Sequence, residues 1–508
     1  MLVTAPRDVV VVLLDSLNRH LLGSYGGTEF DTPNLDRLAA RSVRFTNHQT
    51  GSLPCMPARH DLLVGALDFP WRPWGSIEVW EEAITHLLRR DAGISTMLVS
   101  DHPHLFESGG ENYHADFGAW NYLRGHEDDP WRSRVDPSFI GAPTRRGQWE
   151  HAYDISRTWF RSEADFPGPQ TMTAGARWLE AELSAERQPH ERALLVVDEF
   201  DPHEPFDVPE PWATRYDPDW EGERMIWPPY ARNQAESGLS DRESVHLRSQ
   251  YGAKLSMIDH WLGRILDVVD RHQAWDTTAF VLCTDHGHYL GERGFWGKPQ
   301  VPVHPEMGHI PLLISWPGIA PTTTHALTTT VDLHATLCDT FGVSPEHRTH
   351  GHSLVPLLEG RTSSVRDWAL CGVWGREVHV ADATRTLARA PVEGNRPLSM
   401  FSNRWTTMPI RALGYRMPRP DHRAWLDHLP GSDTPVIRQP FDASDALPFW
   451  AGGTFSNDLV YDRDEADATG EVRNDTGGVA EAEMTELLVE ALTSIEAPAE
   501  QLIRLGLG

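Results

Sequence analysis

The clearest pattern along the chain is a set of short, continuously apolar segments. Five of them occupy residues 9–14, 95–99, 193–197, 278–283 and 312–316. A continuous, β-branched segment is typical of a strand that is buried on both faces of a parallel sheet. Helical patterns lie between and after the segments, starting at Thr32-Pro33 and covering 171–186, 245–271 and 331–341. This alternation predicts an open α/β sheet.

Asp and His residues follow four of these segments directly. They are Asp15, then Asp101 to His104, then Asp198 to His203, and finally Asp285-His286. Because the carboxyl ends of parallel strands meet at one edge of a sheet, we expect Asp15, His203, Asp285 and His286 to lie along that edge. An Asp after a strand often caps a turn, but two carboxylates with an adjacent third donor are what a divalent cation requires.

The pattern changes near residue 372. Beyond it the segments are short and separated by Pro and Gly, with a final apolar segment at 459–462 and an amphipathic helix at 479–495. We therefore expect a main domain over 1–371 and a smaller α+β subdomain over 372–508. Two stretches, 128–166 and 207–239, are longer than ordinary connections between helices and strands. We expect them either to line the active-site cleft or to make contacts between subunits. A homo-oligomer is therefore possible on the sequence alone.

Composition narrows the classes of function. The formal net charge of −28 argues against nucleic acid, because a phosphate backbone is bound by clustered Lys and Arg. No apolar stretch reaches the length that a membrane span requires. The four cysteines show no tight pairing, and the chain runs from Met1 into a strand without a signal peptide, which predicts a cytoplasmic protein with reduced thiols. An anionic substrate would need a local positive site.

Lysine is almost absent from the chain. Only Lys254 and Lys298 occur, against a large excess of arginine. A lysine inside a motif is therefore notable, and Lys298 is such a residue. Lys254 lies within a predicted helix, and we expect it on the surface.

The segment Leu53-Pro54-Cys55-Met56-Pro57-Ala58-Arg59-His60 contains the pattern Cys-x-Pro-x-Arg. It resembles the signature of the type I sulfatases, which belong to the alkaline-phosphatase superfamily. By itself a lone Cys in an apolar stretch is usually an inert core residue. The resemblance implies instead that a formylglycine-generating enzyme oxidises Cys55 to formylglycine. One hydroxyl of the hydrated aldehyde then attacks sulfur, and the other expels sulfate by collapsing back to the aldehyde.

Residues 284–298 are similar to the second sulfatase signature, Asp-His-Gly … Leu-Gly … Gly-Lys, over its whole length. Further resemblances follow in the family's order, at 14–18, 31–36, 201–206, 316–318 and 459–462. The likeness covers nearly the whole chain. It implies an alkaline-phosphatase-like α/β/α sandwich with a largely parallel central sheet, and a C-terminal subdomain with a short antiparallel sheet.

The same resemblance assigns roles to single residues. It implies one divalent ion, Ca²⁺ or Mn²⁺, held by Asp15, Cys55 in its modified form, Asp285 and His286. Arg59 would orient the nucleophile, because a guanidinium does not lose its proton. Lys298 would bind the sulfuryl oxygens, and His203 is the candidate for protonating the leaving oxygen. The expected function is hydrolysis of a small aryl or alkyl sulfate monoester.

The chain departs from the sulfatase pattern in three places. Ser16 stands where many sulfatases have a second Asp, which leaves the identity of the metal open. Ala58 stands where sulfatases often have Ser, and alanine there also occurs in phosphonate monoester hydrolases. The family's Gly-Lys-Trp-His segment is absent. In its place Asp101-His102-Pro103-His104 offers histidines and no lysine, and His104 is our candidate for a catalytic role.

Two alternatives remain beside the sulfatase. A phosphonate monoester or phosphodiester hydrolase uses the same scaffold, since both substrate types carry one negative charge on a tetrahedral centre. A non-catalytic anion-binding relative would keep Cys55 unmodified and bind no metal. The joint presence of Cys55, Arg59, Asp285 and Lys298 favours an enzyme, and the sulfatase is favoured over the phosphonate hydrolase.

Overall fold

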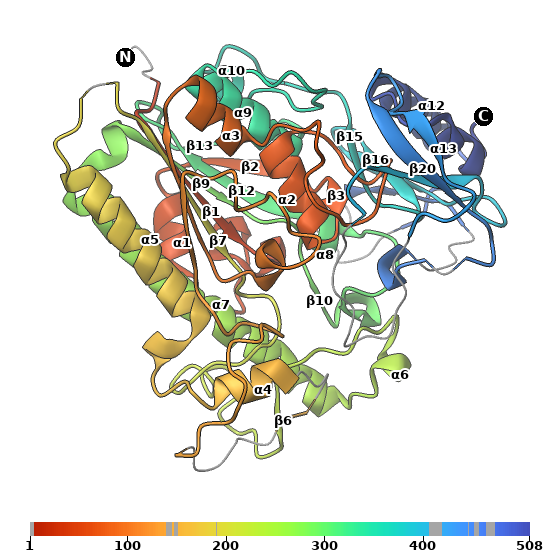
Figure 1. Cartoon of the computed structure of the whole chain (residues 1–508). Helices are drawn as coiled ribbons and strands as arrows, with labels where there is room; N and C mark the ends of the chain where they lie inside the picture. The colour runs from red at the N-terminus through yellow and green to blue at the C-terminus, as the bar shows by residue number, and fades with distance from the viewer. Residues whose placement is uncertain are drawn as a thin grey trace.

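The predicted apolar segments form the centre of a large sheet (Figure 1). The computed structural model describes residues 5–138, 145–146, 151–188, 190–405, 419–445, 447–451, 457–463 and 473–508. Within these ranges the main sheet has nine strands, which are, in spatial order, β13 (Thr322–Thr324), β2 (Val43–Gln49), β12 (His309–Ser315), β9 (Thr278–Cys283), β1 (Asp8–Leu14), β7 (Ala193–Glu199), β4 (Ser95–Ser100) and β5 (Ala119–Tyr122), with β14 (Thr328–Thr329) paired to β2.

The sheet is parallel except for one strand. The five neighbours from β9 to β5 all run in the same direction. β12, which contains the fifth predicted segment, runs antiparallel to both β9 and β2. β2 was not predicted, because its sequence Val-Arg-Phe-Thr-Asn-His-Gln has no continuous apolar stretch. The predicted, largely parallel α/β sheet is confirmed.

Helices cover both faces of the sheet (Figure 1). On one face lie α1 (Pro33–Ala39), α5 (Pro167–Ser184) and α7 (Asp241–Arg271), and on the other α2 (Cys55–Val64), α3 (Ile84–Asp91), α9 (Val331–Phe341) and α10 (Val355–Leu358). Successive side chains of β1 point to opposite faces, so Val10 and Val12 pack in the core beneath α7, whereas Val9 and Val11 pack in the core beneath α3 and α9. Burial on both faces explains why β1 has no polar alternation.

The C-terminal part adds two smaller sheets, seen at the right of Figure 1. In the described part of the chain, the first consists of β21 (Leu459–Asp462), β17 (Arg385–Arg389), β16 (Val378–Ala381), β15 (Ala369–Val373) and β3 (Ser52–Leu53), and the second of β18 (Leu398–Ser402), β20 (Pro435–Phe441) and β19 (Trp425–His428). The helix α12 (Val479–Ser494) packs on β16 and β17, followed by α13 (Ala499–Arg504).

β15 runs through the boundary expected at residues 371 and 372. It pairs in parallel with β3, so that Gly372 lies opposite Ser52 and Val373 opposite Leu53. β3 is separated from Cys55 by one residue only. The C-terminal sheet therefore holds the segment from which α2 starts.

The remaining elements are short. They are β6 (Arg145–Arg146), β8 (Arg224–Met225), β10 (Tyr289–Leu290), β11 (Trp296–Gly297), α4 (His151–Arg157), α6 (Gln234–Ser237) and α8 (Pro305–Gly308). β6 and β8 pair with each other, so the two long stretches meet. None of the helices in the described ranges combines the length and the apolar character that crossing a membrane requires.

A buried ionic cluster anchors α2 from below. His60 lies in the middle of this fully buried helix, and its Nε2 atom is 2.9 Å from Glu81 Oε2. Arg72 lies beside Glu81 and binds Asp68. Burial lowers the pKa of His60, but Glu81 and Asp68 outweigh that effect and raise it to about 9.

The stabilising contribution of His60 should disappear at alkaline pH. An unfolded histidine has a pKa near about 6.5. The contribution is therefore complete below that pH and is lost as the pH rises through about 9. Between pH 6 and pH 10, the difference in free energy of unfolding between wild type and His60→Gln should shrink by about 1–3 kcal/mol in urea titrations.

The half-buried His86 on α3, which lies 4.0 Å from Asp116, offers the control, and His86→Gln should change the free energy of unfolding little and by a similar amount at both pH values. An equal difference for His60→Gln at pH 6 and pH 10 would show that the ring is not held in its charged form.

Candidate active site

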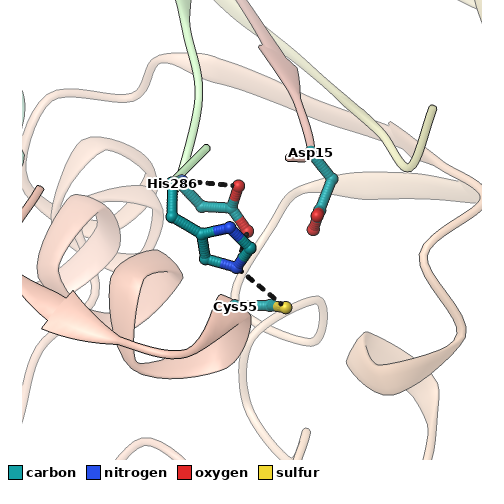
Figure 2. Close-up of side chains that lie close together, drawn as sticks. Asp15, Cys55 and His286 are labelled. Atoms are coloured by element: carbon teal, nitrogen blue, oxygen red, sulfur yellow. Dashed lines mark hydrogen bonds and ion pairs between the residues drawn. The ribbon is translucent and has the colours of Figure 1, made fainter. Parts of the chain in front are cut away.

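Four side chains converge at the carboxyl edge of the main sheet. Asp15 follows β1, Asp285 and His286 follow β9, and Cys55 begins α2. Their potential ligand atoms all lie within 4.8 Å of one another, and all four residues are buried. Figure 2 shows the thiol of Cys55 directed at the ring of His286, with the carboxylate of Asp15 beside them. The distance from Cys55 Sγ to His286 Nε2 is 3.3 Å.

The strand register brings the two carboxylates together. β1 and β9 are parallel neighbours, so Asp15 and Asp285 leave the sheet side by side. Ser16 adopts a φ of 61°, and in this conformation its backbone N–H donates to Asp285 Oδ1 at 3.1 Å, while its hydroxyl donates to Asp15 Oδ1 at 2.8 Å. The residue that replaces the second Asp of many sulfatases thus binds both acids.

The donor set fits a divalent cation. His286 Nδ1 lies 2.8 Å from the carbonyl oxygen of Gly287, which keeps the proton on Nδ1 and leaves Nε2 free as a ligand. Asp15 Oδ2 is buried and accepts no hydrogen bond from the described part of the chain, although Arg59 Nη2 lies 3.0 Å from it. Two carboxylates, an imidazole nitrogen and the Cys55 thiol together offer oxygen, nitrogen and sulfur donors.

Arg59 lies one helical turn after Cys55 and balances the acids. Its guanidinium binds Asp198 through two hydrogen bonds of 2.8 and 2.7 Å, and it donates to Asp285 Oδ2 at 2.8 Å. Burial alone would raise the pKa of Asp15. The Arg59 guanidinium and the Lys298 ammonium outweigh that effect and hold this pKa well below its ordinary value.

The surroundings of Cys55 favour the protonated form of its thiol. Although it lies at the start of a helix, burial and the neighbouring Asp15 and Asp285 raise its pKa well above the ordinary value. Lys298 and Arg59 lower this pKa without reversing the shift. Without a bound cation, a thiol in this position stays protonated near neutral pH.

A second cluster lies on the far side of Cys55. Lys298 Nζ donates to His203 Nε2 at 2.5 Å and lies 3.6 Å from Glu204 Oε1. His203 Nδ1 lies 2.7 Å from the carbonyl oxygen of Glu204. Burial lowers the pKa of His203 to about 3, while Glu204 keeps the pKa of Lys298 well above its usual range despite burial. The ring is neutral, and the proton between the two residues belongs to Lys298.

Three residues of this second cluster escaped sequence reasoning. Glu204 accepts a hydrogen bond from Tyr230 and lies 3.1 Å from His288 Nε2. Tyr230 belongs to the long stretch 207–239, is 40% exposed, and stands beside Lys298. That stretch therefore contributes to the wall of the site. For Glu204, the sequence offered one indication of a role in this cluster, which is its position next to His203.

His102 and His104 have different surroundings. Both ring nitrogens of His104 face carboxylates, since Nδ1 contacts Glu107 and Nε2 lies 3.3 Å from Glu127. His102 Nε2 lies 3.6 Å from Asp15 Oδ2, and neither ring nitrogen of His102 has a hydrogen-bond partner among the residues that the structure describes. Of the two histidines, His102 is the one that lies near Asp15 of the metal-ligand cluster, and the catalytic role expected for His104 stays a prediction.

The prediction for Lys254 is wrong. The residue is only 3% exposed, although it lies within a helix as expected. Its ammonium group contacts the loop that contains His203. Helical periodicity did not reveal this burial, because α7 is covered along most of its length by the segments around it.

A family model described as sulfatase matches residues 7–343. The chain belongs to the sulfatase family. It is 29% identical over 392 residues to a choline-sulfatase of Rhizobium meliloti, covering 70% of this chain and 72% of the relative. It is 25% identical over 404 residues to the arylsulfatase G of Mus musculus, covering 70% of each chain. The sulfatase is thus an enzyme of the sulfuric ester hydrolase class.

Solved structures share the fold of this sulfatase. The phosphonate monoester hydrolase of Silicibacter pomeroyi superposes with a TM-score of 0.64 at 19% identity, covering 96% of this chain and 94% of the other. At this identity the likeness concerns the fold, and it agrees with the alkaline-phosphatase-like architecture predicted from the sequence.

Gly287 limits the space behind His286. A Cβ atom at this position would lie 1.9 Å from the carbonyl oxygen of Glu306. We expect Gly287→Ala to lower the free energy of unfolding by about 1–3 kcal/mol, because backbone must move to accept the methyl group. Gly478→Ala, where no atom lies within 4 Å, should cost less than about 1 kcal/mol in the same denaturant titration. Equal losses for the two variants would contradict the close approach.

Proposed function

We propose that this sulfatase hydrolyses small sulfate monoesters with a formylglycine made from Cys55 and with one divalent cation. The observation that supports this most directly is the cluster of Asp15, Cys55, Asp285 and His286 within 4.8 Å. A formylglycine-generating enzyme would then act on the chain during maturation.

Asp15, Asp285, His286 and the modified residue 55 would hold the cation. When bound, the cation and the hydrated aldehyde would supply an anionic attacking oxygen and a polarised sulfuryl group. The candidates are Ca²⁺ and Mn²⁺. The imidazole ligand favours Mn²⁺, since Ca²⁺ prefers oxygen ligands alone, and Ser16 adds no further carboxylate.

Arg59 and Lys298 are the fixed cations of the site. Arg59 is held by Asp198 on the side opposite Cys55, so its guanidinium keeps one orientation beside residue 55. The Lys298 ammonium would bind sulfuryl oxygens and offset the charge that develops on them. Arg59 stays charged through the reaction and Lys298 is charged when the substrate binds, because the pKa values of both groups lie well above the ordinary ones.

The Lys298–His203 pair would supply the proton for the leaving group. Cleavage of the S–O bond leaves the electron pair on the alcohol oxygen, which then takes the proton shared between Lys298 Nζ and His203 Nε2. Glu204 stabilises the positive charge of the pair before transfer, since it lies 3.6 Å from Lys298 Nζ and 3.4 Å from His203 Nδ1.

A phosphonate monoester or phosphodiester hydrolase is the second candidate. Ala58, the Asp285-His286 pair and the replacement of a second Asp by Ser16 favour it. A phosphonate monoester carries one negative charge, as a sulfate monoester does, so one site can accept both.

For the cellular setting, we propose a reducing cytoplasmic compartment, which the four free, buried cysteines support.

The first test is the mass of the peptide that contains Cys55. In protein coexpressed with a formylglycine-generating enzyme, we expect the thiol to be replaced by an aldehyde. The modified enzyme should hydrolyse 4-nitrophenyl sulfate faster than 4-nitrophenyl phenylphosphonate, and Cys55→Ala should remove both activities. A preference for the phosphonate would favour the second candidate, and an intact thiol in an active enzyme would rule out the formylglycine.

The second test is the metal content. After dialysis, the wild type should retain about one divalent ion per chain, and elemental analysis identifies it. Asp285→Asn should lose at least about tenfold in metal affinity, because a charged ligand is removed. Asp332→Asn is the control: this buried acid binds Arg366 away from the cluster, so the variant should keep its metal even if it is less stable. Equal metal loss in both variants would argue against a site at Asp285.

A further inference from the structure

Lys254 lies at the middle of the 31-residue helix α7 and is buried. Its Nζ atom lies 2.6 Å from Asp201 Oδ1, and it donates to the carbonyl oxygens of His203 at 3.0 Å and Pro205 at 2.6 Å. An ammonium group has three N–H donors, and these three acceptors account for them. All three acceptors belong to the single loop that follows β7.

Both lysines of the chain contact this loop. Lys298 binds the imidazole ring of His203, and Lys254 binds the backbone of the same residue. A buried ammonium is unfavourable unless it is paired and fully hydrogen-bonded, so an apolar side chain in the interior of α7 would be the ordinary solution. Nearly all basic residues of this chain are arginines. The lysine at this position therefore indicates that the loop requires a compact cation whose hydrogen-bond donors are all used.

Asp201 extends the contact to a second loop. Its Oδ1 atom lies 2.7 Å from His126 Nε2, and Lys254 Nζ lies 3.3 Å from the same ring nitrogen. The next residue, Glu127, lies 3.3 Å from His104. Phe200 packs its ring on His203 at 4.2 Å between ring centroids and on His126 at 4.7 Å. The lysine therefore joins α7 to two loops that border the site.

We propose that Lys254 is a positioning residue of the reaction, which fixes the backbone of residues 203–205 and thereby aims the His203 ring at Lys298 and the leaving oxygen. This inference rests on the proposed role of the Lys298–His203 pair. The ring is attached to a backbone whose carbonyl oxygens on both sides of Glu204 bind one buried ammonium, so the loop has little freedom to move the imidazole away.

A positioning role differs from a merely structural one in its dependence on the leaving group. An alcohol of high pKa needs a proton as the S–O bond breaks, whereas 4-nitrophenolate leaves without one. Displacing His203 therefore slows esters of poor leaving groups selectively. A general loss of stability lowers the amount of active enzyme and slows all esters alike.

The test compares phenyl sulfate with 4-nitrophenyl sulfate in Lys254→Met, whose side chain is similar in length and uncharged. We expect kcat/KM for phenyl sulfate to fall by about 10–100-fold and for 4-nitrophenyl sulfate by less than about 3-fold. Asp259→Asn is the matched control on α7, since this carboxylate binds the backbone N–H groups of Asn34 and Leu35 at the start of α1. It should lower the Tm without changing the ratio of the two rates.

A double-mutant cycle then isolates the path through His203. In the His203→Gln background, Lys254→Met should change the ratio of the two rates no further. If Lys254→Met is insoluble, Lys254→Gln replaces it, because the amide still donates two hydrogen bonds without the charge, and the ratio should change in the same direction by a smaller factor.

Two results would overturn the inference while leaving the sulfatase assignment intact. One is an equal loss for both esters in Lys254→Met, as in the control. The other is a full effect of Lys254→Met in the His203→Gln background. A formylglycine-containing wild type that hydrolyses neither ester would instead overturn the proposed function, and this inference with it.

Discussion

One guanidinium holds the active site together. Arg59 contacts Asp15, Asp198 and Asp285, which follow or belong to three neighbouring strands of the main sheet, β1, β7 and β9. Without it, three buried carboxylates would face one another at the same edge, and burial would force them to bind protons. Because Arg59 is one turn away from Cys55, the contact that balances the acids also fixes the helix that begins with Cys55.

The start of α2 is fixed from outside the main sheet as well. β3 pairs with β15 of the C-terminal sheet immediately before Cys55, and the ionic cluster of His60 and Glu81 lies beneath the same helix. The smaller C-terminal part therefore helps to build the candidate active site, because its sheet includes the strand that directly precedes residue 55. This explains why a helix with little intrinsic amphipathic character is stable: all of its residues are buried among elements on every side.

Sequence reasoning found what depends on local pattern. The continuous apolar segments gave β1, β4, β7, β9 and most of β12, and the rule for parallel strands gave the common edge of Asp15 and Asp285. It could not find contacts that depend on non-local pairing. β3 is two residues long, and β2 has a polar sequence. Asp198 was recognised at the end of a strand. Its pairing with Arg59, which is 139 residues away in the sequence, depends on how β7 and α2 lie relative to each other. Lys254 was missed for the same reason.

The balance of charge decides which substrates suit the site. Four buried carboxylates face two fixed cations, and the six residues are Asp15, Asp198, Glu204, Asp285, Arg59 and Lys298. The protein groups alone are thus negative by two charges, within a chain that already has a formal net charge of −28. An anionic ester would be repelled from such a site. A divalent cation held there would bring these six groups to neutrality, and a monoanion would then gain from the nearby Arg59 and Lys298 without an excess of charge to compensate. A dianion would need a further cation, which favours sulfate and phosphonate monoesters over phosphate monoesters.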